Sequence, residues 1–86
     1  MRNLKIRITT ISISMRNYVR DERKRRKLKQ EELAEALKVS RQTINAIEGN
    51  RYWPSLTLAL RLSMFFDMTV NELFIFEKHE LEEFKY

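Results

Sequence analysis

The sequence predicts a single small all-α domain. Eighty-six residues suffice for one modest hydrophobic core. Apolar residues recur every three or four positions in several short segments, which is the spacing of amphipathic helices. Cap and turn residues separate these segments, and the single glycine and the single proline lie between two of them, at Gly49 and Pro54. The pattern therefore favours a compact bundle of short helices.

The first two helices are expected over residues 17–26 and 30–37. In the second of them, Leu33, Ala34 and Leu37 recur at helical spacing and define one apolar face. Because the side chain of Ala34 is small, it allows another helix to cross closely at that point. The second helix is therefore expected to pack tightly against the helix that follows it.

A third helix is expected over residues 41–48, after a break of three residues. Ile44 and Ile47 form its apolar face. Ser40 is suited to cap it, because the serine hydroxyl can accept a hydrogen bond from a free backbone N–H of the first turn. Two short helices joined by a tight turn are typical of a helix-turn-helix, whose second helix enters the major groove of DNA.

The outward side chains of this third helix are of the kinds that read or clamp nucleic acid. With both isoleucines facing inward, four polar residues point outward: Arg41, Gln42, Thr43 and Asn45. Arginine pairs with guanine, glutamine and asparagine pair with adenine, and threonine suits a phosphate or a thymine methyl. The third helix is therefore the expected recognition helix.

The rest of the chain supplies two further helices. Gly49 is expected to end the third helix in a left-handed conformation, and a loop then leads to Ser55, which is suited to cap the fourth helix. The expected apolar stripe of the fourth helix is Leu56, Leu60 and Met64, with Ala59 and Leu62 beside it. Residues 69–72 match a capping box that opens a fifth helix, with Leu73 and Phe74 as its buried residues.

Charge is distributed unevenly along the chain. Residues 1–54 hold 14 Lys and Arg against 6 Asp and Glu, a balance of +8, and residues 55–86 hold 3 against 6, a balance of −3. A polyanion should therefore approach the half that contains the helix-turn-helix. The basic run at residues 23–27 would by itself be typical of a solvated helix face. Beside the motif, attraction of phosphates is the better account.

The residues around the motif resemble the Cro/repressor-type (Xre-like) helix-turn-helix regulators. The resemblance covers residues 15–76 and is carried by Val19, Arg23 and the runs QEELA at 30–34, VSRQTI at 39–44, IEGNR at 47–51, PSL at 54–56 and ELF at 72–74. These motifs are specific together and weak singly. The resemblance implies a compact five-helix domain that binds operator DNA as a dimer.

The resemblance and the expected geometry indicate the same DNA contacts. The expected DNA-binding residues are Gln30, Ser40, Arg41, Gln42, Thr43, Asn45 and Arg51. Gln30 opens the second helix, where its side chain and the helix N-terminus can hold a phosphate. The first turn of the third helix should read bases, whereas Arg51 should hold the DNA backbone. The resemblance also implies a partly buried structural ion pair between Arg23 and Glu48.

The sequence departs from the family pattern at three places. Lys29 stands where the second helix usually has a Ser or Thr cap, and Lys38 fills a turn position that is often glycine. Either the turn tolerates a strained lysine or its geometry differs. The third departure is an N-terminal extension, residues 1–14, before the usual family start. In addition, Tyr52 and Trp53 are expected to pack beneath their loop rather than contact DNA.

The extension alternates apolar and polar side chains, with one shift of register, which is the periodicity of a strand. Because a single strand is not stable alone, we expect a β-strand within residues 4–13 to pair with the same strand of a second subunit. Alternatively, Arg2, Lys5 and Arg7 form a basic arm that enters the minor groove. A third interpretation is a misassigned upstream start.

The C-terminal third offers a second possible dimer surface. Its apolar side chains either cap the core or join two subunits: Phe65, Phe66, Phe74, Ile75 and Phe76. Residues 77–86 are expected to form a tail or a short helix.

Other classes of protein are disfavoured. The chain has no cysteine, which excludes disulfides and thiolate metal sites and fits the cytoplasm. A single histidine, His79, and the lack of a nucleophile–base pair predict no metal, no cofactor and no enzymatic activity. The most apolar run, residues 56–66, is too short to span a membrane.

The sequence therefore predicts a sequence-specific, double-stranded DNA-binding protein that acts as a dimeric transcriptional repressor on a palindromic operator. The alternative is a protein-binding module, for example an antitoxin-like protein that uses DNA only for autoregulation. An exposed aromatic C-terminal patch occupied by a different protein, and not by a second copy of the chain, would favour that alternative.

Overall fold

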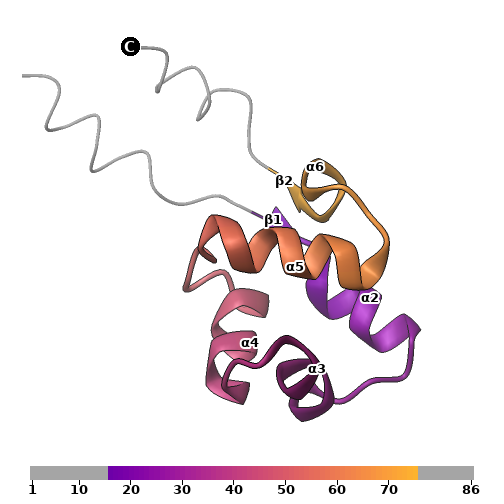
Figure 1. Cartoon of the computed structure of the whole chain (residues 1–86), viewed down its shortest axis with the longest axis vertical. Coiled ribbons are helices and arrows are strands. Elements are labelled where there is room, and N and C mark those ends of the chain that lie inside the picture. The colour runs from indigo at the N-terminus through magenta and orange to yellow at the C-terminus, as the bar shows by residue number, and fades with distance from the viewer. Residues whose placement is uncertain (1–15, 76–86) are drawn as a thin grey trace, which may run out of the picture.

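The computed structural model describes residues 16–75, which form five helices and one two-stranded sheet (Figure 1). In chain order the elements are β1 (Arg16–Asn17), α2 (Val19–Arg25), α3 (Gln30–Leu37), α4 (Arg41–Glu48), α5 (Leu56–Phe66), α6 (Val70–Leu73) and β2 (Phe74–Ile75). The expected all-α, five-helix architecture is confirmed. The extension 1–14, with its expected strand over 4–13, and the tail 77–86 lie outside the described residues.

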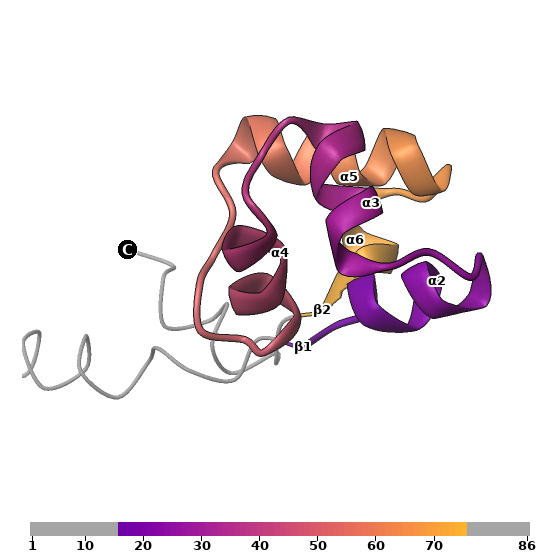
Figure 2. The same ribbon diagram turned by 90° about the horizontal axis from the view of Figure 1, so that it is seen from below.

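The helix-turn-helix has the predicted bounds. α3 and α4 begin and end at the expected residues, and they lie side by side in both views (Figures 1 and 2). In the turn between them, Lys38 adopts a left-handed backbone with φ of 58°, and the backbone N–H of Val39 donates to the carbonyl of Ala34 at 3.0 Å. Of the two alternatives expected from the sequence, a strained lysine or a different turn geometry, the structure has the strained lysine. The turn is closed by a backbone hydrogen bond that is usual at helix C-termini.

The start of α3 is capped without a Ser or Thr side chain. The Glu32 carboxylate accepts a hydrogen bond from the backbone N–H of Lys29 at 2.7 Å. This bond satisfies the amide just before the helix, and the negative charge of Glu32 suits the positive end of the helix dipole.

A short sheet joins the two ends of the described chain. Asn17 pairs with Phe74 and Arg16 pairs with Ile75 in antiparallel register. The first helix therefore begins at Val19 and not at residue 17, because the backbone of Asn17 belongs to β1. Phe74 is buried as expected, but it lies in β2 rather than in the fifth helix.

One hydrophobic core lies between the helices. Its buried residues are Val19, Leu33, Ala34, Leu37, Ile44, Ile47, Leu58, Ala59, Leu62, Phe66, Leu73 and Phe74. Figure 2 shows α5 along one edge of this bundle, with α3 reaching toward it from the side of α2. Within residues 16–75, no helix is both long enough and apolar enough to cross a membrane.

α5 turns a different face to the core from the one expected. Leu58, Leu62 and Phe66 are buried, whereas the predicted stripe of Leu56, Leu60 and Met64 is exposed. The two stripes run along the same helix and are both apolar, so apolar spacing alone cannot choose between them. The predicted cap is present, because the Ser55 hydroxyl accepts a hydrogen bond from the Leu58 backbone N–H at 3.1 Å.

Candidate nucleic-acid interface

α4 is fixed on its inner side and capped at its start. Ile44 and Ile47 are fully buried, which sets the rotation of the helix. The Ser40 hydroxyl accepts a hydrogen bond from the Thr43 backbone N–H at 3.1 Å, and the two side-chain oxygens lie 2.9 Å apart. Ser40 and Thr43 thus hold each other at the first turn, where their hydroxyls remain at the surface.

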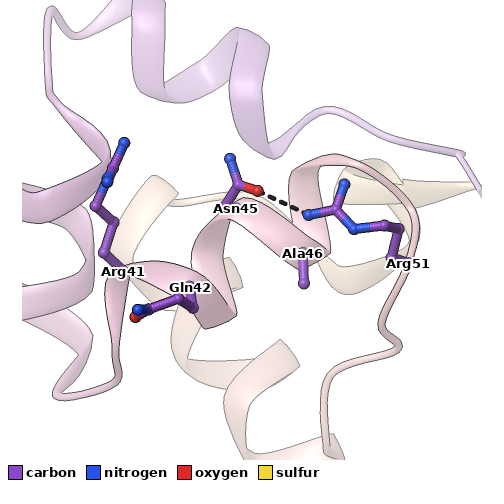
Figure 3. Close-up of a pocket in the computed structure, with 5 residues that line it drawn as sticks. All are labelled: Arg41, Gln42, Asn45, Ala46 and Arg51. Carbon is purple, nitrogen blue, oxygen red and sulfur yellow. Dashed lines mark hydrogen bonds between the residues drawn. The ribbon is translucent and has the colours of Figure 1, made fainter.

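The outer side of α4 carries two shallow hollows. One, of about 430 Å³, is lined by Arg41, Gln42, Asn45, Ala46 and Arg51 (Figure 3). The other, of about 390 Å³, is lined by Gln42, Thr43, Ala46, Arg51 and Tyr52. Gln42, Ala46 and Arg51 belong to both hollows. Because Ala46 is small, it leaves room between its larger polar neighbours for a base edge or a thymine methyl.

A chain of hydrogen bonds crosses this surface. Arg51 donates from Nη2 to Asn45 Oδ1 at 2.7 Å (Figure 3). Asn45 donates to Gln30 Oε1 at 3.5 Å, and Gln30 donates from Nε2 to Glu48 Oε1 at 3.0 Å. The side chain of Gln30, the first residue of α3, is therefore connected by hydrogen bonds to α4 and to Arg51 in the loop after α4.

Glu48 anchors the inner end of that chain. Its carboxylate accepts hydrogen bonds from Arg23 Nε at 2.7 Å and from Arg23 Nη2 at 3.1 Å, so the structure brings these two residues together as a bidentate pair. The Glu48 side chain is 0% exposed and that of Arg23 is 10% exposed. Arg20 adds a longer contact at 3.5 Å.

The protonation of this pair follows from its surroundings. Burial acts to raise the pKa of Glu48, but the hydrogen bonds from Arg23 and Gln30 outweigh it, so the pKa lies below its ordinary value. The hydrogen bonds that Arg23 donates to Glu48 raise the pKa of Arg23. Both groups are therefore charged at neutral pH, and Glu48 is held as an acceptor.

The end of α4 differs from the sequence expectation. Gly49 has a φ of −88°, and Asn50 is the left-handed residue with a φ of 59°. Asparagine tolerates this conformation because its short polar side chain can bond locally, and here it accepts a hydrogen bond from Asn17 at 2.9 Å. Gly49 instead gives space, since a Cβ there would collide with the guanidinium of Arg51.

The basic run 23–27 is largely engaged within the protein. Arg25 and Arg26 both pair with Glu22, at 2.8 and 2.6 Å. Hydrogen bonds from Arg26 and then Arg25 lower the pKa of Glu22. Arg26 also donates to the carbonyl of Phe66 at 2.8 Å and stacks over its ring. Arg26 thus joins the end of α2 to the end of α5. These contacts of Arg25 and Arg26 within the protein weaken the account of this run as a phosphate-attracting patch.

Tyr52 and Trp53 do not pack beneath their loop. Their exposed fractions are 44% and 48%, and neither belongs to the buried core. Tyr52 lines a hollow beside Gln42, so it belongs to the candidate interface. The sequence reasoning missed this role, and the one available signal was an aromatic residue shortly after the recognition helix.

The remaining expected contacts share one surface. Gln30, Arg41, Gln42, Asn45 and Arg51 are connected by the hollows and hydrogen bonds described above. Within residues 16–75, the structure has no group of three His, Cys, Asp or Glu side chains that would hold a metal ion.

Comparisons with known proteins agree with this geometry. A family model described as helix-turn-helix matches residues 19–73. An uncharacterized HTH-type transcriptional regulator of Methanocaldococcus jannaschii is 46% identical over 66 residues, covering 77% of this chain and 100% of the relative. The uncharacterized HTH-type transcriptional regulator YgzD of Bacillus subtilis is 42% identical over 64 residues, covering 74% of this chain and 97% of the relative.

A phage protein is also similar. The ImmF control region 10 kDa protein of Bacillus phage phi105 is 37% identical over 65 residues, covering 76% of this chain and 72% of the relative. The matched segment contains the helix-turn-helix and the helices that support it. The chain therefore belongs to the Cro/repressor-type (Xre-like) helix-turn-helix regulator family.

Proposed function

We propose that this protein binds double-stranded DNA sequence-specifically, as a dimeric transcriptional repressor that reads the major groove with α4. The observation that carries the proposal is the outer face of α4, where Arg41, Gln42 and Asn45 line one hollow together with the small side chain of Ala46. Arginine and amide side chains are those that bind guanine and adenine edges through two hydrogen bonds.

Each residue has a proposed role. Arg41 and Gln42 read base edges from the first turn of α4. Arg51 and Gln30, whose side chains both bond to Asn45, hold phosphates beside the groove and so set the register of the protein on the duplex. Ser40 and Thr43, whose hydroxyls lie 2.9 Å apart, add a phosphate contact at the helix start. Asn45 holds Arg51 by the 2.7 Å bond and lies at the edge of the groove.

The assembly follows from the way such helices meet DNA. Two copies related by a two-fold axis would present their α4 helices to successive major grooves, and the half-sites of a palindromic operator would lie about 34 Å apart. Repression is proposed because occupancy of an operator is sufficient for it. We assign this role to residues 15–76, with 1–14 as an extension and 77–86 as a tail, and we place its action in the cytoplasm.

A second candidate function has one observation in its favour. The exposed apolar face of α5 would also suit a different protein, as in an antitoxin-like module that uses DNA only for autoregulation. The two functions differ in what covers that face, which is either a second copy of this chain or a different protein.

The test of DNA reading is selection from a randomised duplex pool with the wild type, Gln42→Ala and Asn71→Ala. Asn71 is an exposed amide residue on α6 and serves as the matched control. We expect a palindrome from the wild type and Asn71→Ala, and loss of preference at one position per half-site with Gln42→Ala. If the wild type enriches no sequence and its binding disappears at moderate salt, only electrostatic attraction remains and the proposal fails.

A further inference from the structure

α5 presents an apolar stripe to solvent, formed by Leu56, Leu60 and Met64. These side chains are 74%, 46% and 78% exposed and follow one another at four-residue spacing, so they line one side of the helix. Phe65 beside them is 38% exposed. The outward side of a surface helix is normally polar, and an exposed apolar patch marks an interaction site.

We propose that this stripe is the surface through which two copies of the chain associate, with α5 packed antiparallel against α5 of the second copy. The inference rests on the proposed function, because it names the contact that joins two DNA-reading helices. Of the C-terminal aromatic residues that either cap the core or join two subunits, Phe66 and Phe74 are buried in the core, whereas Phe65 is exposed beside the stripe.

A second copy fits the stripe because the stripe is complementary to itself. An interface around a two-fold axis brings the same patch of both subunits together. An axis at the central residue, Leu60, places Leu56 opposite Met64 of the partner subunit, and the reverse contact follows by symmetry. Every facing pair is then apolar.

The charge of the face points to the same occupant. In a chain that is 34% charged, the eleven residues of α5 include one charged residue, Arg61. A partner recognised by charge would find little here to pair with. When two copies of this nearly neutral face meet, no like charges face each other at the centre of the contact. Arg61 then lies at the rim.

The size of the stripe is adequate for an interface of modest extent. The exposed parts of Leu56, Leu60, Met64 and Phe65 amount to on the order of 500 Å² per copy, against roughly 800 Å² per partner in an interface of standard size. Rim residues such as Thr57 and Arg61 would supply part of the remainder. The short loop from α4 to α5 then makes the spacing of the two α4 helices depend on this contact.

Disulfide trapping tests the contact directly, because the chain has no cysteine and each variant carries one. Packed helices lie about 8–10 Å apart axis to axis, so the two Leu60→Cys residues come within disulfide reach, roughly 4.4–6.8 Å between Cα atoms. The two Met64→Cys residues would be separated by about 12 Å, since each lies four residues from the axis at 1.5 Å per residue. Ala36→Cys, on an exposed position of α3, is the control for random collisions.

Each variant of the full chain is oxidised without DNA and analysed by non-reducing electrophoresis. We expect rapid covalent dimers from Leu60→Cys and at most slow ones from Met64→Cys and Ala36→Cys. Equal rates for all three would overturn the proposal.

Sedimentation of variants that carry a charge in the stripe tests the α5 contact independently. Leu60→Glu and Met64→Glu should convert a dimeric wild type to a monomer while circular dichroism stays unchanged, and Ala36→Glu should remain dimeric. A monomeric wild type, or dimers that survive both stripe variants, would refute the α5 contact.

Neither measurement uses DNA, so the two proposals can fail separately. If Leu60→Cys is trapped but selection enriches nothing, the proposed function fails and the contact stands. If selection succeeds but the trapping pattern is absent, only the contact fails.

Discussion

Replacement of Glu48 by alanine should destabilise the protein more than any loss of a surface charge. The change strands the Arg23 guanidinium, whose side chain is 10% exposed, without the two bonds it now donates. Breaking a buried ion pair costs roughly 3–5 kcal/mol. Because Arg23 keeps its 2.8 Å bond to the Leu28 carbonyl, we expect about 3 kcal/mol, the lower end of that range.

Thermal and urea unfolding followed by circular dichroism measure this loss. For a domain of this size, 3 kcal/mol corresponds to a fall in Tm of roughly 12–24 °C. Glu22→Ala is the control. Like Arg23, Glu22 belongs to α2, but its ion pairs to Arg25 and Arg26 lie at the surface. If Glu48→Ala costs no more than Glu22→Ala, the reasoning about burial is refuted.

Two further measurements separate the effect of the unpaired Arg23 charge from the effect of lost side-chain packing at Glu48. The double variant Arg23→Met, Glu48→Leu should be more stable than Glu48→Ala, because it leaves no unpaired charge inside. The pKa of Glu48 is lowered in the folded protein. Its stabilising contribution is therefore fully present above the ordinary carboxyl pKa of 4.5 and is lost as pH falls through the lower, folded-state value. A pH series should show a smaller acid-side loss in the double variant than in the wild type.

Three other substitutions test the local geometry. Lys38→Gly should raise stability by up to about 1 kcal/mol in urea unfolding, because glycine adopts the left-handed φ of 58° without strain; unchanged or lower stability would contradict this. Gly49→Ala should weaken DNA binding with little change in Tm, because the new Cβ displaces the Arg51 guanidinium while a φ of −88° suits alanine; undiminished affinity would show that Arg51 does not need its present position. Tyr52→Ala should change affinity for the selected site, whereas Tyr18→Ala, equally exposed at 44%, should not; identical binding by both would remove Tyr52 from the interface.

The sequence was most informative where caps and breaks are local. The bounds of α3 and α4 were predicted correctly because Ser40 caps α4 and the apolar spacing changes phase across the turn. The buried residues Leu33 and Ile44 followed from the same pattern. These elements position the candidate interface, so the outward side chains of α4 could be named from the sequence, while their contacts with DNA stay a prediction.

The sequence was least informative where two solutions share the same local pattern. α5 is apolar on more than one side, so spacing did not show that Leu58 rather than Leu60 faces the core. The β1–β2 pair consists of two residues per strand, too few for a periodic signal. Gly49 was the natural choice for a left-handed residue, yet Asn50 takes that role because its side chain is bonded to Asn17.

The exposed aromatic residues show a related limit. Whether Tyr52 and Trp53 pack inward depends on the space left by the helices, which only the folded arrangement determines. The same arrangement places Tyr52 beside Gln42 in the hollow next to α4.

Base reading by α4 is tested by comparing affinity for the selected operator with affinity for a scrambled duplex at physiological salt. For the wild type, we expect a ratio of at least about 10³. Gln42→Ala should weaken operator binding by roughly 5- to 150-fold, corresponding to about 1–3 kcal/mol, with little effect on the scrambled duplex. Arg51→Ala should weaken both alike, as a phosphate contact does. A wild-type ratio near one, or equal loss on both duplexes with Gln42→Ala, would contradict base reading by α4.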